Sequence, residues 1–389
     1  MTRRERLMAT IKGLPIDRPP VCFYEIDGYT QHSEDLDPFN IFSHPSWRPL
    51  LELAKEKSDS IITYNVPFVG ESAASQSNNK SVKSEKYFKD GTCFHKRTVD
   101  TGGRILTELT RRDTDVNTSW VIEHLLKDID DFKAWLELPD AELAGTPDTK
   151  AVTALEKKVD EAGIVMFNTI DPLGATAQMF SMEEYTVIAM TEQKLFHKAL
   201  EKQARFIYQK VEAVAKAMPG RLWRICGPEY ASPPYLPPYL FYEYVVKYVK
   251  PMIDIIHKYG GYARIHSHGR LKDILDYIVD TGCMGLDPIE PPPQGDLELA
   301  YLRQNYGDKL VLFGNLEASD LENLPAVQFE KKIMKALEEG SSGKGLGFVL
   351  MPSACPYGRV LSPIAMKNYE KMIECAEKFE HVLSSATIP

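Results

Sequence analysis

The chain has 389 residues, a formal net charge of −9, and ordinary shares of hydrophobic (43%) and charged (26%) residues. A chain of this size and composition buries a large core unaided, which excludes a disordered, fibrous or small disulfide-rich protein. The acidic balance argues against nucleic-acid binding, and no apolar run is long enough to span a membrane. No apolar stretch typical of a secretion signal follows Met1–Arg6, so we expect a cytoplasmic protein with reduced cysteines.

Short apolar runs alternate with helical patterns along most of the chain. Continuous apolar runs are typical of parallel strands that are covered on both faces. Such strands are expected at Pro20–Ile26, Ser60–Val66, Gly163–Ile170, Arg221–Cys226, Tyr262–His266, Gly285–Ile289, Leu310–Gly314 and Phe348–Met351. Apolar residues at helical spacing predict helices at 45–57, 151–162, 192–218, 241–259, 271–278, 327–339 and 363–380.

This alternation predicts a closed (β/α)8 TIM barrel, with residues 1–389 as a single domain. An open doubly wound sheet is the alternative, but no Gly-x-Gly-x-x-Gly turn follows the first predicted strand. Residues about 68–140 interrupt the alternation. Within them, Lys86–Thr98 and Arg104–Arg111 flank a Gly-rich turn, which predicts a β-hairpin insertion after the second strand.

Polar residues gather where the predicted strands end. In a barrel of this kind the chemistry takes place at the carboxyl ends of the strands. These ends carry Tyr24, Glu25, Asn168, Asp171, Cys226, Glu229, His266, His268, Asp287, Glu290, Asn315, Glu317 and Cys355. The beginnings of the strands carry nothing comparable, and this asymmetry favours an enzyme.

The His266-Ser267-His268-Gly269 motif ends the fifth predicted strand. Residues two apart on a strand point to the same side, so both imidazoles can bind one metal ion. The alternative is a pair of hydrogen-bonded structural histidines. Cys355 follows the last strand, where barrel closure brings it to the same end, although a single cysteine is more often a buried, inert thiol. Two histidines and one cysteine predict a zinc site whose fourth position stays open for catalysis.

A loop rich in proline and tyrosine, Ala231–Tyr239, follows Glu229. One interpretation is that Tyr230, Tyr235 and Tyr239 form an apolar wall for a flat ligand. The alternative is a proline-braced connection on the surface.

The opening stretches Arg3–Arg6 and Asp17–Pro20, the His-x-His-Gly motif, Gly314-Asn315 and the Cys355 loop resemble the uroporphyrinogen decarboxylase superfamily over nearly the whole chain. The resemblance implies an (α/β)8 barrel. The decarboxylases of this superfamily carry an Arg-Gln-Ala-Gly-Arg stretch that binds porphyrinogen carboxylates. The corresponding Phe23–Tyr29 has no arginine pair and contains two acids that would repel an acidic substrate, so porphyrinogen decarboxylation is not expected.

The superfamily also includes cobalamin-linked, zinc-dependent methyltransferases, which hold zinc with His-x-Cys and a later Cys. His266, His268 and Cys355 match these positions, with His in place of the middle Cys. A His-His-Cys set has one thiolate fewer than a His-Cys-Cys set and so neutralises less of the charge of zinc, which suits polarisation of a neutral ether oxygen. The His-x-His pattern and the Tyr-rich loop are similar to the branch that demethylates aryl methyl ethers.

The resemblance implies a methyltransferase that moves a methyl group from a methoxylated aromatic, or a similar small donor, to the cob(I)alamin of a corrinoid protein. No Asp-x-His-x-x-Gly cobalamin motif occurs, so a partner must supply the cobalamin; a homodimer is compatible with this scheme. We expect catalytic roles for Glu229, Tyr235, Glu25 and Asp171, with Glu229 or Tyr235 as the acid. The expected substrate-binding residues are Tyr24, Asn168, Tyr230, Tyr239 and Asn315.

Two alternatives come from other classes of protein. One is a metal-free lyase or decarboxylase that uses Glu25, Asp171 and Glu229 as acid–base groups. The other is a non-catalytic barrel that binds a corrinoid or a small molecule and in which the metal is structural.

Overall fold

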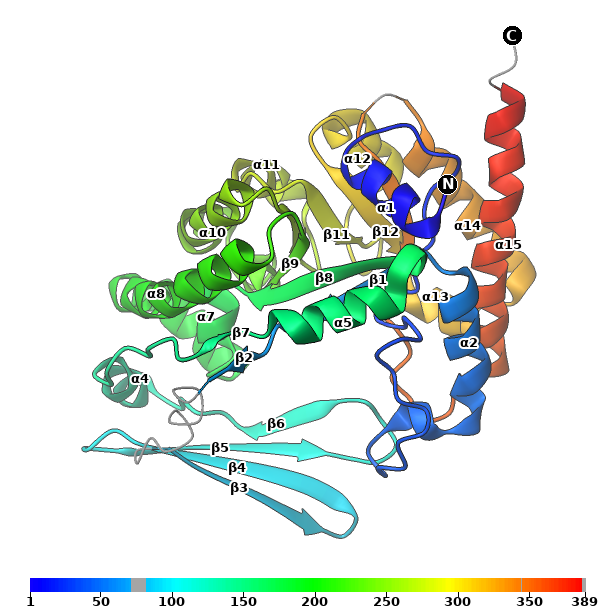
Figure 1. Ribbon diagram of the computed structural model, residues 1–389. Coiled ribbons are helices and arrows are strands. Elements are labelled where there is room, and N and C mark those ends of the chain that lie inside the picture. The colour runs from blue at the N-terminus through cyan, green and yellow to red at the C-terminus, as the bar shows by residue number, and fades with distance from the viewer. Residues whose placement is uncertain (71–81, 344, 387–389) are drawn as a thin grey trace.

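The computed structural model describes residues 1–70, 82–343 and 345–386, so residues 71–81 of the predicted insertion lie outside the described part. Within the described residues, seven strands form one curled parallel sheet (Figure 1). In spatial order they are β1 (Ser60–Tyr64), β8 (Gly163–Ile170), β9 (Leu222–Cys226), β10 (Tyr262–His266), β11 (Gly285–Ile289), β12 (Val311–Leu316) and β13 (Phe348–Pro352). Their order follows the chain, as expected for a barrel of strand–helix units.

The helices of the barrel are α1 (Arg3–Ile11), α2 (Arg48–Lys57), α5 (Thr149–Val159), α6 (Pro172–Ala177), α7 (Met182–Thr191), α8 (Gln193–Ala217), α9 (Pro238–Phe241), α10 (Lys247–Lys258), α11 (Leu275–Asp280), α12 (Leu299–Tyr306), α13 (Ala318–Asn323), α14 (Ala326–Ser341) and α15 (Pro363–Ala386). Most of them lie outside the curled sheet (Figure 1), whereas α1 places Leu7 and Ile11 in the apolar cluster inside the barrel. The predicted helix at 192–218 is confirmed as α8, which buries Phe196, Leu200, Ile207, Val211 and Val214 along one stripe. No helix in the described ranges combines the length and the apolar character needed to cross a membrane.

The eighth position of the barrel is filled by a short extended segment at residues 20–22. Val21 forms a parallel bridge with Leu350 of β13, and the Cys22 amide donates to the Leu350 carbonyl at 3.0 Å. On the other side, the Asp59 amide donates to the Val21 carbonyl at 2.7 Å. The TIM-barrel prediction is confirmed, but the predicted strand Pro20–Ile26 is reduced to this bridge, because Tyr24 has a left-handed backbone (φ 58°) that ends the extended run.

A buried cluster of charged residues fastens the closing segment to the start of β1. The Asp59 carboxylate is fully buried and accepts from Arg6 at 2.6 Å and from Arg18 at 2.9 Å. Its Oδ2 atom also accepts from the Val21 amide at 2.8 Å, and Arg6 reaches Asp17 at 2.6 Å. The charged residues that open the chain therefore have a structural role in closing the barrel.

Replacing Asp59 by alanine should lower the free energy of unfolding by about 3–5 kcal/mol, because it leaves two largely buried guanidinium groups without their shared carboxylate. Urea denaturation measures this loss. Asp254→Ala is the matched control, since it removes an exposed carboxylate paired with Lys250 and should cost about 0–1 kcal/mol. Equal stability of the two variants would contradict a closing role for the cluster.

The insertion is larger than the predicted hairpin. In the described residues it contains an antiparallel sheet of β3 (Val82–Lys89), β4 (Thr92–Asp100), β5 (Ile105–Arg112) and β6 (Ser119–Glu123), with α4 (Ile129–Leu136) and a short β2 (Phe68–Val69)–β7 (Thr146–Pro147) ladder. The turn between β4 and β5 confirms the predicted hairpin. The single strand predicted at Lys86–Thr98 is wrong, because Asp90 and Gly91 both have positive φ (52° and 79°) and form a tight turn.

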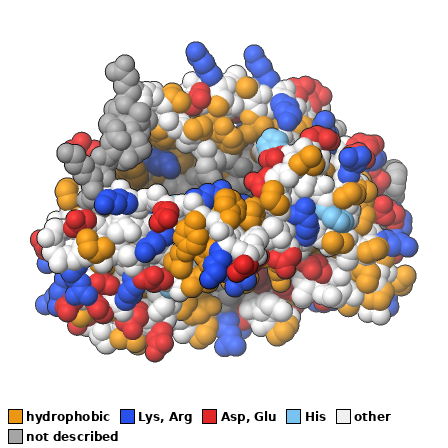
Figure 2. Space-filling view, turned by 90° about the horizontal axis from the view of Figure 1, so that it is seen from below, with side chains coloured by type: hydrophobic (Ala, Val, Ile, Leu, Met, Phe, Trp, Pro, Cys, Tyr) orange, Lys and Arg blue, Asp and Glu red, His pale blue; other side chains and the backbone are white. Residues whose placement is uncertain are grey.

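The insertion stands beside the carboxyl-end mouth of the barrel. Arg112 donates to the Phe39 carbonyl at 2.7 Å, and Asn117 donates to the Tyr357 carbonyl at 2.7 Å. Phe39 and Tyr357 lie on the loops that follow the closing segment and β13, so both contacts are on the carboxyl side. Figure 1 shows the antiparallel sheet on this side of the barrel, and Figure 2 shows that the same face is hollowed near its centre.

The barrel interior changes from apolar to polar along the strands. The inner core consists of Leu7, Ile11, Cys22, Tyr24, Ile61, Ile164, Met166, Leu222, Val311, Phe313, Val349 and Met351. Residues two apart on a strand share a face, so the same inward rows continue to Asn168, Arg224, Cys226, Arg264, His266 and Asp287. A polar layer therefore lies above the apolar one, toward the mouth.

Candidate active site

Two imidazole–carboxylate pairs lie side by side at the ends of β10 and β11. The Nδ1 atom of His266 is 2.9 Å from Asp287 Oδ1, and that of His268 is 2.9 Å from Glu290 Oε1. The two rings are 4.7 Å apart and meet edge to face. Neither Nε2 atom has a hydrogen-bond partner in the described part of the chain. Carboxylates at Nδ1 commonly orient the imidazoles that bind a metal through Nε2, so both histidines fit that use.

The two histidines differ in their electrostatic surroundings. Burial lowers the pKa of His266, and this outweighs the opposing effect of Asp287, so the ring is mostly neutral at pH 7. Burial also acts to lower the pKa of His268, but the hydrogen bond and charge of Glu290 outweigh it and raise the pKa. Only a neutral imidazole binds a metal, so protonation of His268 competes with metal binding up to a higher pH than it would at an ordinary histidine.

Cys355 lies on the loop after β13, with its Sγ atom 3.9 Å from Glu25 Oε2. Burial and the nearby Glu25 carboxylate raise the pKa of this thiol to about 12. Across the ranges that the structure describes, no group of three or more His, Cys, Asp or Glu side chains is arranged to hold a metal ion. The structure thus brings the two histidines together, whereas the three-ligand set with Cys355 stays a prediction.

Tyr24 and Asn168, both predicted to bind substrate, meet at Arg224. Arg224 donates to Asn168 Oδ1 at 3.1 Å and to the Tyr24 hydroxyl at 3.0 Å. The Tyr24 ring lies 6.2 Å from the His266 ring, which joins this group to the histidines. The next strand adds Arg264, which pairs with Asp287 at 3.0 Å.

Arg224 and Arg264 were not among the predicted site residues. Each interrupts an otherwise apolar strand, in Arg-Leu-Trp-Arg-Ile-Cys and Tyr-Ala-Arg-Ile-His. Each also lies two positions before Cys226 or His266, and so shares its inward face. A charged residue at an inward position of a buried strand is a signal that could have identified both.

The predicted acids occupy different surroundings. Glu229 accepts from the Gly227 amide at 2.9 Å, and its charge helps to raise the pKa of His268. Asp171 is fully buried and accepts from the Gly174 amide at 2.6 Å, where it caps α6. Burial raises the pKa of Asp171 well above its usual range, and Glu229 adds to the effect.

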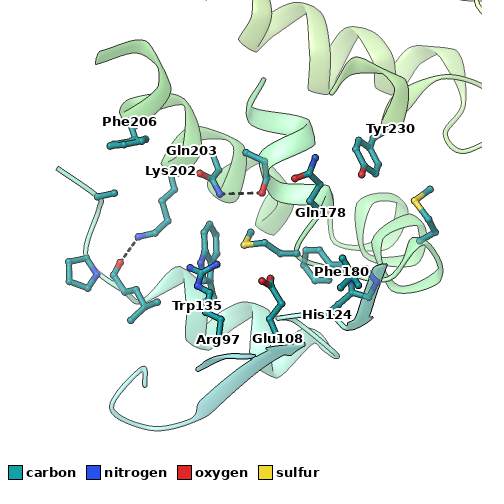
Figure 3. Close-up of a pocket in the computed structure, with 17 residues that line it drawn as sticks. Arg97, Glu108, His124, Trp135, Gln178, Phe180, Lys202, Gln203, Phe206 and Tyr230 are labelled. Atoms are coloured by element: carbon teal, nitrogen blue, oxygen red, sulfur yellow. Dashed lines mark hydrogen bonds between the residues drawn. The ribbon is translucent and has the colours of Figure 1, made fainter. Parts of the chain in front are cut away.

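Other predicted residues lie farther from the histidine pairs. Asn315 lies on β12 and lines a small cavity of about 80 Å³ near the carboxyl end. Tyr230 is partly buried and lines a cavity of about 730 Å³ between the insertion and the barrel, with Trp135 and Phe180 (Figure 3). Tyr235 and Tyr239 are 50% and 53% exposed. The loop therefore contributes one residue to a cavity wall and two to the surface.

Fold and site together define a TIM-barrel protein that carries paired histidines on the face where such barrels place their chemistry. The family model for uroporphyrinogen decarboxylase (URO-D) matches residues 114–379. This match spans more than half of the chain, which therefore belongs to that family. No curated protein matches the chain.

Comparison with solved structures supports the fold. A methyltransferase from Methanosarcina mazei matches with a TM-score of 0.60 and 16% identity, over 97% of this chain and 99% of that one. D-Psicose 3-epimerase from Clostridium cellulolyticum H10 matches over 60% of this chain and 83% of that one, with a TM-score of 0.35 and 11% identity. The second likeness is too remote to support an argument.

Proposed function

We propose that the protein is a zinc-dependent methyltransferase that moves a methyl group from a methoxylated aromatic, or a similar small donor, to the cob(I)alamin of a separate corrinoid protein. The observation that carries this proposal is the pair of carboxylate-held imidazoles at the mouth of the barrel. Family membership and the fold likeness to the Methanosarcina mazei methyltransferase agree with it.

In this proposal His266, His268 and Cys355 hold the zinc ion. Bound there, zinc would supply Lewis acidity to the ether oxygen of the donor. Asp287 and Glu290 fix the orientation of the two rings and strengthen them as ligands. To join them, the Cys355 thiol must give up its proton and its contact with Glu25.

Release of the demethylated product requires a proton, and Glu229 and Tyr235 are the proposed donors. Glu229 is the better placed, because its charge reaches His268 whereas half of Tyr235 is exposed. Asp171 is enclosed, so its proposed effect passes through Glu229. Glu25 lies beside Cys355, where its negative charge opposes formation of the thiolate until a cation is present.

Tyr24 and Asn168 are the proposed substrate contacts closest to the histidines, and Tyr230 and Tyr239 extend the aromatic surface outward. Asn315 would complete the rim on β12. The hollowed face around the mouth is the proposed docking surface for the corrinoid protein (Figure 2). All of these proposed site residues belong to one barrel, so the proposed reaction needs no second catalytic domain.

The deciding experiment incubates the zinc-loaded protein with methoxyarenes and cob(I)alamin and follows methylcobalamin by its visible spectrum. Methyl transfer supports the proposal. Release of carbon dioxide from a carboxylated ligand by metal-free protein would instead indicate a lyase. Ligand or corrinoid binding without turnover would indicate a non-catalytic barrel.

A further inference from the structure

A guanidinium group that forms no direct ion pair with the described residues lies in the inner layer of the barrel. Arg224 faces inward from β9, and no carboxylate of the described residues lies within 4.0 Å of its nitrogen atoms. The adjacent Arg264 does have a partner, Asp287, but His266 shares that carboxylate. The charges of Asp287 and Glu25 act on Arg224 from farther away. Neither carboxylate forms an ion pair with the guanidinium, so an anion from outside the chain would be the first to pair with it directly.

The groups around Arg224 offer hydrogen-bond donors. Its guanidinium has five N–H groups, and two hydrogen bonds, to Asn168 and Tyr24, are formed with described residues. Its Nε atom is buried and has no hydrogen-bond partner in the described ranges. The Tyr24 hydroxyl accepts from Arg224 and so keeps its own proton for donation. Donors that converge in this way suit a carboxylate, which only accepts.

We propose that Arg224, with Tyr24 beside it, binds a carboxylate on the methyl donor, so that the substrate is an anionic methoxyarene. This inference rests on the proposed function, because it names the class of donor for the same site. Two acids were expected to repel an acidic substrate. Asp27 is held in its own loop by the backbone amides of Tyr29 and Thr30, and the charge of the exposed Glu25 is opposed by that of Arg224 itself.

The position of Arg224 relative to the histidines sets the orientation of the ligand. Arg224 pairs in register with Arg264, two residues before the row that contains His266. At about 3.3 Å per residue, the backbone of Arg224 lies about 6.6 Å before that row along the strand. A benzoate with its methoxy group at the far end of the ring can span the two rows. The carboxylate then points inward, and the ether oxygen lies at the level of the histidines.

Calorimetric titration with 4-methoxybenzoate and its neutral analogue 4-methoxybenzamide tests this inference. The zinc-loaded wild type should bind the benzoate more tightly, and Arg224→Met should weaken benzoate binding by about 10- to 100-fold while changing amide binding little. Arg224→Lys keeps the charge and should retain part of the preference. Arg221→Met is the matched control, because Arg221 lies on the outside of the same segment and pairs with Glu156.

The outcomes separate this inference from the proposed function, because the titration needs no corrinoid. A benzoate preference that disappears in Arg224→Met supports the anchor even if methyl transfer fails. Equal binding of both probes by the wild type would overturn it. The same holds for a preference that survives in a folded Arg224→Met variant. If Arg224→Met does not fold, two other variants decide. A preference for the benzoate over the amide that is as strong as in the wild type, in both Tyr24→Phe and Arg224→Lys, would also overturn the inference.

Discussion

Replacing His266 or His268 by alanine, or Cys355 by serine, should each remove most of the one zinc ion expected per chain. Each change deletes one of three protein ligands, and two remaining ligands hold zinc far more weakly. Metal analysis of protein purified without a polyhistidine tag gives the occupancy directly. Unchanged occupancy in all three variants would rule out the site.

The carboxylate partners provide a graded second measurement. Glu290→Gln leaves both imidazoles in place but removes the charge that orients His268, so zinc affinity should fall by about 10–100-fold and not vanish. His95→Ala is a matched control, because His95 is an exposed histidine on β4 of the insertion. If Cys355→Ser keeps its zinc while both histidine variants lose it, only the two histidines are ligands. Cys355 is then a neighbour of Glu25 and not a zinc ligand.

The strands that form the sheet could be predicted because their signal is local. Runs such as Gly163–Ile170 and Phe348–Met351 are almost entirely apolar, as is typical of parallel strands covered on both faces, and both are confirmed. The closing segment could not be predicted in the same way. Its extended run ends at Tyr24, whose hydroxyl accepts from Arg224, 200 residues away in the chain. The Asp90-Gly91 turn, in contrast, was a local signal that the prediction of one strand at Lys86–Thr98 overlooked.

The same distinction applies to the candidate site. The spacing of His266 and His268 predicted two neighbouring imidazoles, and the structure places their rings side by side. Their partners Asp287 and Glu290 are 21 and 22 residues away, and only the register of β10 with β11 brings them into contact. The tyrosines of the Pro-rich loop show what the sequence pattern could not predict, namely which side chains are covered. Their spacing is compatible with a cavity wall or a surface, and neighbouring elements decide which residues are covered.

No methoxyarene should be demethylated by this protein and zinc alone. An ether methyl group passes only to a strong nucleophile, and water or a protonated thiol is a weak one. Of the two cysteines near the mouth, Cys355 is a proposed zinc ligand and Cys226 ends β9. Burial raises the pKa of the Cys226 thiol to about 11, so at pH 7 almost all of it is protonated. The described residues thus offer no competent acceptor at the site.

Supplying reduced corrinoid, free or on its carrier protein, should therefore change the rate from undetectable to measurable. The assay compares zinc-loaded protein in corrinoid-free buffer with the same protein plus cob(I)alamin, and follows both the phenol and methylcobalamin. Equal amounts of the two products are expected, because each methyl group lost by the ether has one acceptor. The variant Cys226→Ser tests whether the Cys226 thiol itself accepts the methyl group. If it does, phenol formation without corrinoid should disappear in this variant. Phenol formation without corrinoid, in the wild type and in Cys226→Ser alike, would contradict methyl transfer and favour a hydrolytic or lyase reaction.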